Sequence, residues 1–306
     1  MKLAADTKKA FDNGYQIAWD STSIETLQTC PQKYYLSMVR GIKPKLQSPH
    51  LLFGGLFAEA IENYYKLRFS GKSSEDALRQ VVWDALKNSF NREKGIPKAF
   101  MHNAKTRLGL IRSIIWYFEE YGDEIETPLH VYKLQNGLPA VELSFTIEHN
   151  DILFCGHLDR VMEDDTALYI MDQKTTGATL GLHYFRQFDT SNQMTLYILA
   201  GKILFDMPIA AAIIDAAQIA VNFTRFQRGV TMRSDTRIIS WLADIEELID
   251  RSRTYTANGK WPHNWSACGN YGGCPFRSLC TAEPKLRERI IEAEFEEHHW
   301  DPLEAR

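Results

Sequence analysis

Hydrophobic residues recur every three to four positions in the first third of the chain and every second position from about residue 128. The first pattern predicts amphipathic helices, and the second predicts antiparallel strands joined by turns that contain Gly or Asn. Residues 21–23 (Ser-Thr-Ser) are the expected N-cap of the first helix. We expect helices over residues 24–39, 51–68, 74–93, 104–121 and 236–255. This mixed order is typical of an α/β fold.

Residues 152–175 have the pattern of a β-hairpin, with strands over about 152–162 and 167–175 and an acidic turn between them. Side chains alternate between the faces of a strand. Cys155, His157 and Asp159 therefore share one side of the first strand, and Asp172 and Lys174 share one side of the second. Pairing of those sides brings two carboxylates and one ammonium together. Such a group suits a hard divalent cation and an activated water.

Each piece of this hairpin also has a simpler interpretation. An Asp near a strand end is commonly solvated, and an Asp-X-Lys sequence on a strand is commonly a surface ion pair. Tyr169, Ile170 and Met171 indicate, however, that the second strand enters a core just before its charges. Charges at such a position are costly unless they are paired or metal-bound. The combination therefore favours a functional site.

Composition places the chain among ordinary globular proteins. It has 306 residues, 44% hydrophobic and 24% charged, which allows one large domain or two small ones. A net charge of −4 argues against an electrostatic grip on nucleic acid by the whole protein, but a local basic groove is compatible with it. We see no membrane-spanning run and no signal peptide, and we expect a cytoplasmic protein.

The cysteines are clustered near the end of the chain. Cys268, Cys274 and Cys280 recur every six residues, and the glycines at 269, 272 and 273 let the backbone fold tightly around a bound group. Disulfides are uncommon in the cytoplasm, so the cluster suggests a metal centre. Three cysteines do not complete a four-thiolate site. Cys155, alone on a core strand, is expected to be a small buried hydrophobe.

Three motifs follow one another in the second half of the chain: GHLDRV at 156–161, YIMDQKTTG at 169–177, and the Gln193-Met-Thr-Leu-Tyr197 segment of a helix that follows. In this order they resemble the RecB-like branch of the PD-(D/E)XK nuclease superfamily. The resemblance implies a restriction-endonuclease-like core with a mixed β-sheet flanked by helices. It divides the chain into an N-terminal helical region (1–127), a nuclease core (128–258) and a Cys-rich C-terminal segment (259–306).

The resemblance also assigns roles to residues of the motifs. Asp159 and Asp172 are the expected ligands of Mg²⁺ or Mn²⁺, and Lys174 is expected to position or activate the attacking water. Gln193 is expected to orient that lysine or the substrate phosphate. Tyr197 lies one helical turn further on, on the same helix face, and is expected to support the arrangement.

The helix over residues 51–68 departs from the family pattern. Relatives carry a metal-binding His there, but the alignment puts Ala58 at its position. Glu62, one turn further on, is our first substitute as a metal ligand, and Glu59 is the second. The alternative is that both are solvated helix charges. In that case metal affinity or activity is in doubt.

The N-terminal Cys30-Pro31, followed by Tyr34 and Tyr35, resembles the segment that supplies the first cluster ligand in some relatives. In AddB-type and CRISPR-associated relatives, one N-terminal and three C-terminal cysteines hold a [4Fe–4S] cluster. The likeness implies the same role for Cys30, Cys268, Cys274 and Cys280, although the C-terminal spacing differs from the usual one. The simpler alternatives are a zinc site with four ligands or, for Cys30, a core position on a helix.

The resemblance as a whole predicts a metal-dependent DNA nuclease. We expect an exonuclease that acts on single strands or DNA ends in replication, recombination, repair or CRISPR adaptation, with proteins of those processes as partners. The sequence has no P-loop and hence no helicase motor. The alternative is a catalytically weakened nuclease fold that binds nucleic acid or forms a complex, and the missing His favours it.

Overall fold

The computed structural model describes residues 2–3, 9–12, 14–46, 48–91, 96–97 and 103–304. The chain forms two compact units, each built from separate stretches. Unit 1 comprises Met1–Gln47, Ser144–Gly156 and Ser234–Arg306. Unit 2 comprises Ser48–Leu143 and His157–Arg233. Strands β9 (Val141–His149) and β10 (Ile152–Glu163) contribute residues to both units.

The sheet of unit 2 is mixed, as the sequence predicts. Strand β10 pairs antiparallel with β11 (Leu168–Thr176), β11 pairs parallel with β12 (Ile209–Ile219), and β12 pairs antiparallel with β13 (Thr224–Thr231). The short strand β8 (His130–Val131) pairs with β10. The connection from β11 to β12 runs through α6 (Leu182–Arg186), the 3₁₀ turn η2 (Gln187–Thr190) and α7 (Asn192–Leu204).

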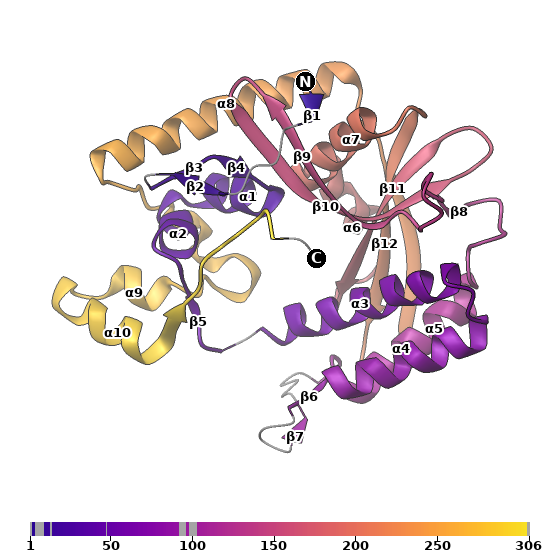
Figure 1. Ribbon diagram of the computed structural model, residues 1–306. Coiled ribbons are helices and arrows are strands. Elements are labelled where there is room, and N and C mark those ends of the chain that lie inside the picture. The colour runs from indigo at the N-terminus through magenta and orange to yellow at the C-terminus, as the bar shows by residue number, and fades with distance from the viewer. Residues whose placement is uncertain are drawn as a thin grey trace. The chain divides into compact units, whose positions relative to one another are not determined.

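Helices pack on both faces of this sheet, as Figure 1 shows for α3, α5 and α7. Helices α3 (Pro49–Phe69), α4 (Ser74–Asn88) and α5 (Arg107–Tyr121) share a hydrophobic core with Met171 and Ile213 of the strands. Helix α7 packs on the other face, where a Cβ on Gly201 would lie 3.0 Å from Ile170. We call these the α5 face and the α7 face.

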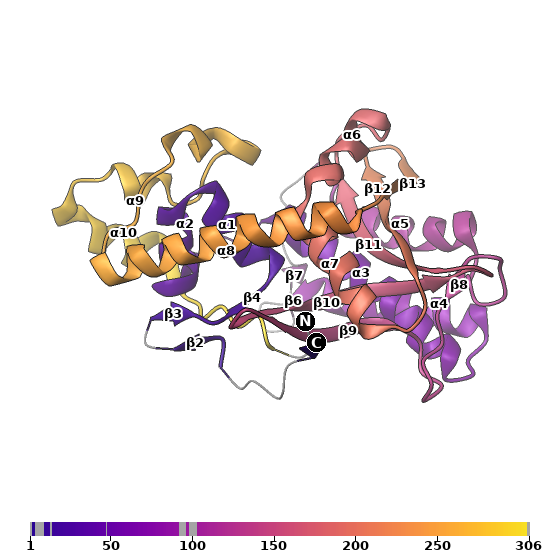
Figure 2. The same ribbon diagram turned by 90° about the horizontal axis from the view of Figure 1, so that it is seen from above.

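Unit 1 is largely helical. Helix α8 (Asp235–Asn258) begins after the N-cap Ser234 and lies beside α1 (Ser21–Thr29), as Figure 2 shows. The remaining elements of unit 1 are α2 (Pro31–Tyr34), η1 (Tyr35–Val39), η3 (Trp265–Gly272), α9 (Arg277–Thr281), η4 (Pro284–Leu286), α10 (Arg287–Glu294), β1 (Lys2–Leu3), β2 (Phe11–Asp12), β3 (Tyr15–Gln16), β4 (Ala18–Trp19), β5 (Ile42–Pro44) and β14 (Phe295–Glu297). The short strands β6 (Phe90–Asn91) and β7 (Ile96–Pro97) belong to unit 2.

The first predicted helix differs from expectation in two ways. Its N-cap is Asp20, whose carboxylate accepts from the backbone N–H groups of Thr22 and Ser23, and Ser23 returns a bond in a capping box. The helix also breaks at Cys30, which is extended (φ −163°, ψ 110°). Pro31 explains the break, because a proline disfavours helical backbone at the preceding residue. Cys30 thus lies between two helices.

The α/β fold class predicted from the sequence is confirmed by this mixed sheet and its flanking helices. Helices α3, α5 and α8 lie where the hydrophobic pattern places them, within three residues at each end. The helix expected over residues 74–93 begins as expected but ends at Asn88, and Phe90–Asn91 form a short strand instead. No helix in the described parts of the chain combines the length and hydrophobicity needed to cross a bilayer.

Candidate active site

The predicted hairpin brings its charged residues together on the α7 face. The register pairs Arg160 with Met171, and extending it by one residue sets Asp159 opposite Asp172. Asp159 Oδ2 accepts a hydrogen bond of 2.9 Å from the backbone N–H of Gln173. Lys174 Nζ lies 2.6 Å from Asp172 Oδ2, and the Lys174 side chain is 30% exposed. Two carboxylates and one ammonium therefore form a single group.

Helix α7 holds the lysine from the side. Lys174 Nζ donates to Gln193 Oε1 at 3.0 Å, and Gln193 Nε2 donates to the Tyr197 hydroxyl at 3.1 Å. The helix is fixed by its N-cap, Ser191, which accepts from Met194 N–H. Residues four apart share a helix face, so Tyr197 can hold the Gln193 side chain, which in turn holds Lys174.

Two further acids border this group. Glu62, on α3, lies close to Glu142 and Asp159, and burial followed by hydrogen bonding and repulsion from Glu142 raises the pKa of Glu62 to about 9. Glu59 is instead exposed and accepts a hydrogen bond from Asn88. The geometry therefore brings Glu62, and not Glu59, to the site.

Glu142 is a site residue that the sequence reasoning missed. It lies near the start of β9, where regular alternation was expected, but its backbone is left-handed (φ 53°). That conformation is uncommon for a residue other than glycine and breaks the alternation of faces. An acid between apolar residues in the sequence Ala-Val-Glu-Leu was the only available signal.

The electrostatics of the group are unbalanced. Burial and the charge of Asp172 raise the pKa of Asp159 to about 7, and burial also raises the pKa of Asp172. Burial opposes the charge of Lys174, but Asp172 and Asp159 outweigh it and raise its pKa. Together with Glu62, these acids outnumber the one ammonium, and their raised pKa values show that the site does not favour all of them in the charged form.

Unsatisfied oxygens mark where a cation fits. Asp172 Oδ1 and Glu142 Oε2 are buried and have no hydrogen-bond partner among the described residues. Carboxylate oxygens are the donors that Mg²⁺ and Mn²⁺ prefer. The donor set therefore fits a divalent cation, although the described side chains do not form a ready-made metal site.

The α5 face of the same strands carries a compensated network. Arg160 is 1% exposed and donates to Asp215 Oδ2 (2.6 Å), to the Tyr117 hydroxyl (3.0 Å) and to Gln173 Oε1 (3.0 Å). Gln173 Nε2 donates to the Asp215 carbonyl at 2.8 Å. Gln173 thereby links the network to Asp159, which its backbone N–H contacts.

Three more residues complete the network. Arg228 contacts both oxygens of Glu124, and its Nε lies 3.4 Å from Asp215 Oδ1. Glu124 also accepts from the Tyr65 hydroxyl at 2.8 Å. Two guanidinium groups thus face two carboxylates, and the charges balance. None of these contacts was predicted from the sequence.

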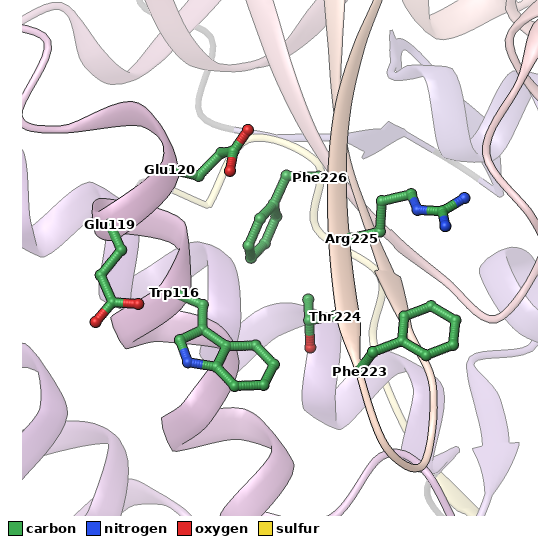
Figure 3. Close-up of a pocket in the computed structure, with 7 residues that line it drawn as sticks. All are labelled: Trp116, Glu119, Glu120, Phe223, Thr224, Arg225 and Phe226. Carbon is green, nitrogen blue, oxygen red and sulfur yellow. The ribbon is translucent and has the colours of Figure 1, made fainter.

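A hollow of about 540 Å³ lies between α5 and the β12–β13 hairpin. Figure 3 shows its lining, which comprises Trp116, Glu119, Glu120, Phe223, Thr224, Arg225 and Phe226. Phe226 points from the hairpin toward α5, the side of the sheet opposite Asp172. The hollow is therefore separate from the candidate active site.

The four predicted cluster cysteines gather in unit 1. Burial, followed by the neighbouring thiols of Cys274, Cys30 and Cys268, raises the pKa of Cys280 to about 11. Asn264 joins the Cys-rich segment to the segment around Cys30, because its backbone N–H donates to Cys30 Sγ at 3.4 Å and its side chain donates to the Thr29 carbonyl. All four side chains are partly exposed free thiols.

The aromatic residues near Cys30 pack on the Cys-rich segment. Trp261 is 8% exposed and contacts the rings of Tyr34 and Tyr35 at centroid distances of 5.4 and 5.7 Å. Four cysteines are a donor set that fits an iron–sulfur cluster or zinc. As with the carboxylates, the described thiols are not arranged as a finished metal site. Cys155 is 1% exposed and packs with Ala18, as expected of a core cysteine.

Comparisons with known proteins bear on the fold and the family of the chain. The chain is similar to the crystal structure of a candidate exonuclease from Eubacterium rectale, with a TM-score of 0.51 and 14% identity over 83% of this chain and 86% of that one. A second structure, SSO0001, gives a TM-score of only 0.29 at 12% identity, over 65% of this chain and 84% of that one. No curated protein matches the chain. A family model for the PD-(D/E)XK nuclease superfamily matches residues 19–281, and the chain therefore belongs to that superfamily.

Proposed function

We propose that this protein is a Mg²⁺- or Mn²⁺-dependent DNA exonuclease that acts on single strands or DNA ends. The observation that carries the proposal is the group of Asp159, Asp172 and Lys174, with its lysine held by Gln193. Membership of a nuclease superfamily supports hydrolysis of a phosphodiester bond. Replication, recombination, repair and CRISPR adaptation are the processes we propose for it.

In the proposed hydrolysis, the acids, Lys174 and the residues of α7 have separate roles. Asp159 and Asp172, with Glu62 and Glu142 beside them, supply the oxygens for a divalent cation, which when bound polarises the scissile phosphate and lowers the pKa of a water. The neighbouring acids raise the pKa of Lys174 and keep it cationic. Lys174 is placed to position or activate the water and to stabilise negative charge on the phosphate. Gln193 and Tyr197 fix its position.

A cleavage assay with end-labelled single- and double-stranded DNA, in Mg²⁺ or Mn²⁺, tests the proposal. We expect Lys174→Ala to lower the rate by at least about 10²-fold, because it removes a charge that acts on the transition state. Lys72→Ala, an exposed lysine between α3 and α4, is the matched control. Equal cleavage by the parent and Lys174→Ala would refute the assignment. Metal-independent binding without cleavage would favour the weakened nuclease suggested by Ala58.

We further propose that Cys30, Cys268, Cys274 and Cys280 hold a [4Fe–4S] cluster that ties the two ends of unit 1 together. The mutual proximity of the four thiols supports this proposal. Anaerobic purification followed by iron analysis and visible absorption tests it, since a cluster is brown and zinc is colourless. Cys274→Ser is expected to lose the colour, whereas Cys155→Ala, outside the group, is expected to keep it. Protein that contains zinc and no iron would refute the iron–sulfur cluster and support the four-ligand zinc site.

A further inference from the structure

The segment from Leu182 to Thr190 is anchored to strand β13 and the residues that follow it. The ring of Phe185 lies directly on Gly229, where an added Cβ would come within 2.1 Å of it. Thr231 Oγ1 donates to Asp189 at 3.0 Å, and Arg233 donates to the Phe188 carbonyl at 2.7 Å. These contacts fix the backbone of α6 and η2 against the sheet.

The same contacts place α6 beside the carboxylates. Asp172 pairs with Ile214, and Ile214 pairs with Gly229, so the three residues form one row across β11, β12 and β13. Residues in one row share a face, and the row spans about 10 Å. Tyr184 of α6 lies close enough to Asp172 to respond to its charge. Burial and then that carboxylate raise the pKa of Tyr184 to about 12. Helix α6 therefore borders the candidate active site.

The outer side of α6 carries an apolar residue and two basic residues. Leu182 is 70% exposed, and His183 and Arg186 are also exposed. Arg186 lies four residues after Leu182 and three after His183, so it shares a helix face with each. The chain as a whole is negative and the site is rich in acids. The guanidinium of Arg186 here is thus suited to draw a phosphate backbone to the site, and the His183 imidazole can donate a hydrogen bond to it.

We propose that α6 binds a single-stranded nucleic acid next to the scissile phosphate, with Arg186 and His183 on phosphates and Leu182 against a base. This inference rests on the proposed function and names the substrate class of the same site. An exposed apolar side chain beside an arginine matches a single strand, whose bases are unstacked and accessible. The anchored backbone lowers the entropy lost on binding.

Fluorescence anisotropy with a labelled oligothymidine tests the proposal. The full chain is used in Ca²⁺ in place of Mg²⁺ to separate binding from cleavage. We expect Arg186→Ala to raise the Kd about fivefold and to reduce the slope of log Kd against log salt by about one. Arg79→Ala, an exposed arginine on α4, is the matched control and is expected to leave both unchanged.

Leu182→Ala tests the base contact separately. We expect it to raise the Kd about fivefold for oligothymidine and to leave the Kd for an abasic strand of equal length unchanged. Leu108→Ala, which alters a leucine of α5 that is 78% exposed, is the control. Equal losses on both strands would contradict base packing.

The outcomes separate this inference from the proposed function. Parent-level binding by Arg186→Ala and Leu182→Ala, in a protein that cleaves, overturns the inference alone. Binding that depends on α6 in a protein that does not cleave supports the inference and removes the nuclease function. A parent protein that binds no strand, or that loses duplex binding as much as single-strand binding in both variants, also overturns it.

Discussion

The hairpin formed by β10 and β11 buries charged side chains on both faces, but the charges are balanced on one face only. On the α5 face, Arg160 and Arg228 are matched by Asp215 and Glu124, and each is held by several hydrogen bonds. On the α7 face, the acids around Lys174 outnumber it, and Asp172 Oδ1 has no hydrogen-bond partner in the described part of the chain. Adjacent residues, such as Asp159 and Arg160, belong to different faces.

This difference separates structural from functional charge. A buried ion pair that is fully compensated holds the strands in place, and breaking it is costly. A group of acids with raised pKa values is unfavourable by itself and is characteristic of sites that bind a cation or perform chemistry. The network on one face therefore stabilises the strands that carry the strained group on the other.

The largest expected effect is on cleavage. Asp172→Asn is expected to reduce the cleavage rate by about 10³-fold, because it removes a carboxylate that acts through the cation. Its melting temperature in EDTA is expected to equal or exceed that of the parent, since the buried acids outnumber Lys174 and Asp159 remains beside it when Asp172 is neutralised. Cleavage assays and thermal melts measure the two effects. A lower melting temperature would break the comparison between the faces.

The second effect is on stability. Asp215→Asn leaves two guanidinium groups facing one carboxylate, and we expect it to lower the free energy of unfolding by about 3–5 kcal/mol. Asp250→Asn, which removes one partner of an exposed ion pair with Arg253, is expected to cost less than about 1 kcal/mol. Denaturant titrations measure both. Equal costs for the two variants would show that the buried network has no special role.

The third effect concerns pH. The pKa of Glu62 is raised in the folded protein from about 4.5 to about 9. Its contribution to stability is therefore complete below about pH 4.5 and is lost as the pH rises toward 9, because the folded state retains a proton that the unfolded state releases. Melting temperatures in EDTA are expected to fall less over this range in Glu62→Gln than in the parent. Identical pH profiles would contradict the raised pKa.

The hydrophobic pattern was enough to predict the long helices and the central hairpin of unit 2. The alternation in residues 152–175 predicted the hairpin, and the helical spacing of Gln193 and Tyr197 predicted their shared side. These are local signals, and each depends on the regular geometry of one element. The roles of these residues in catalysis remain proposals that the assays above test.

Other features depend on contacts between distant residues or on irregular backbone. Asp215 lies in the apolar stretch of β12, and its partners come from α5, β10 and β13. Glu142 reaches the acidic group through a left-handed residue that alternation does not predict. The break at Cys30 follows from Pro31, whereas the helical periodicity of the residues on both sides predicts one continuous helix.

The discontinuous make-up of the two units limits how the chain can be divided. The backbone passes from one unit to the other at residues 47/48, 143/144, 156/157 and 233/234. A fragment over residues 48–233 would keep Asp159, Asp172 and Lys174. Residues 144–156 would, however, lose the strands β1 and β4 that pair with them and the rest of unit 1, which includes α8. Truncation from either end also removes some of the clustered cysteines. Point substitutions in the chain of residues 1–306 are therefore a better route to separate DNA cleavage from cluster binding than the preparation of isolated units.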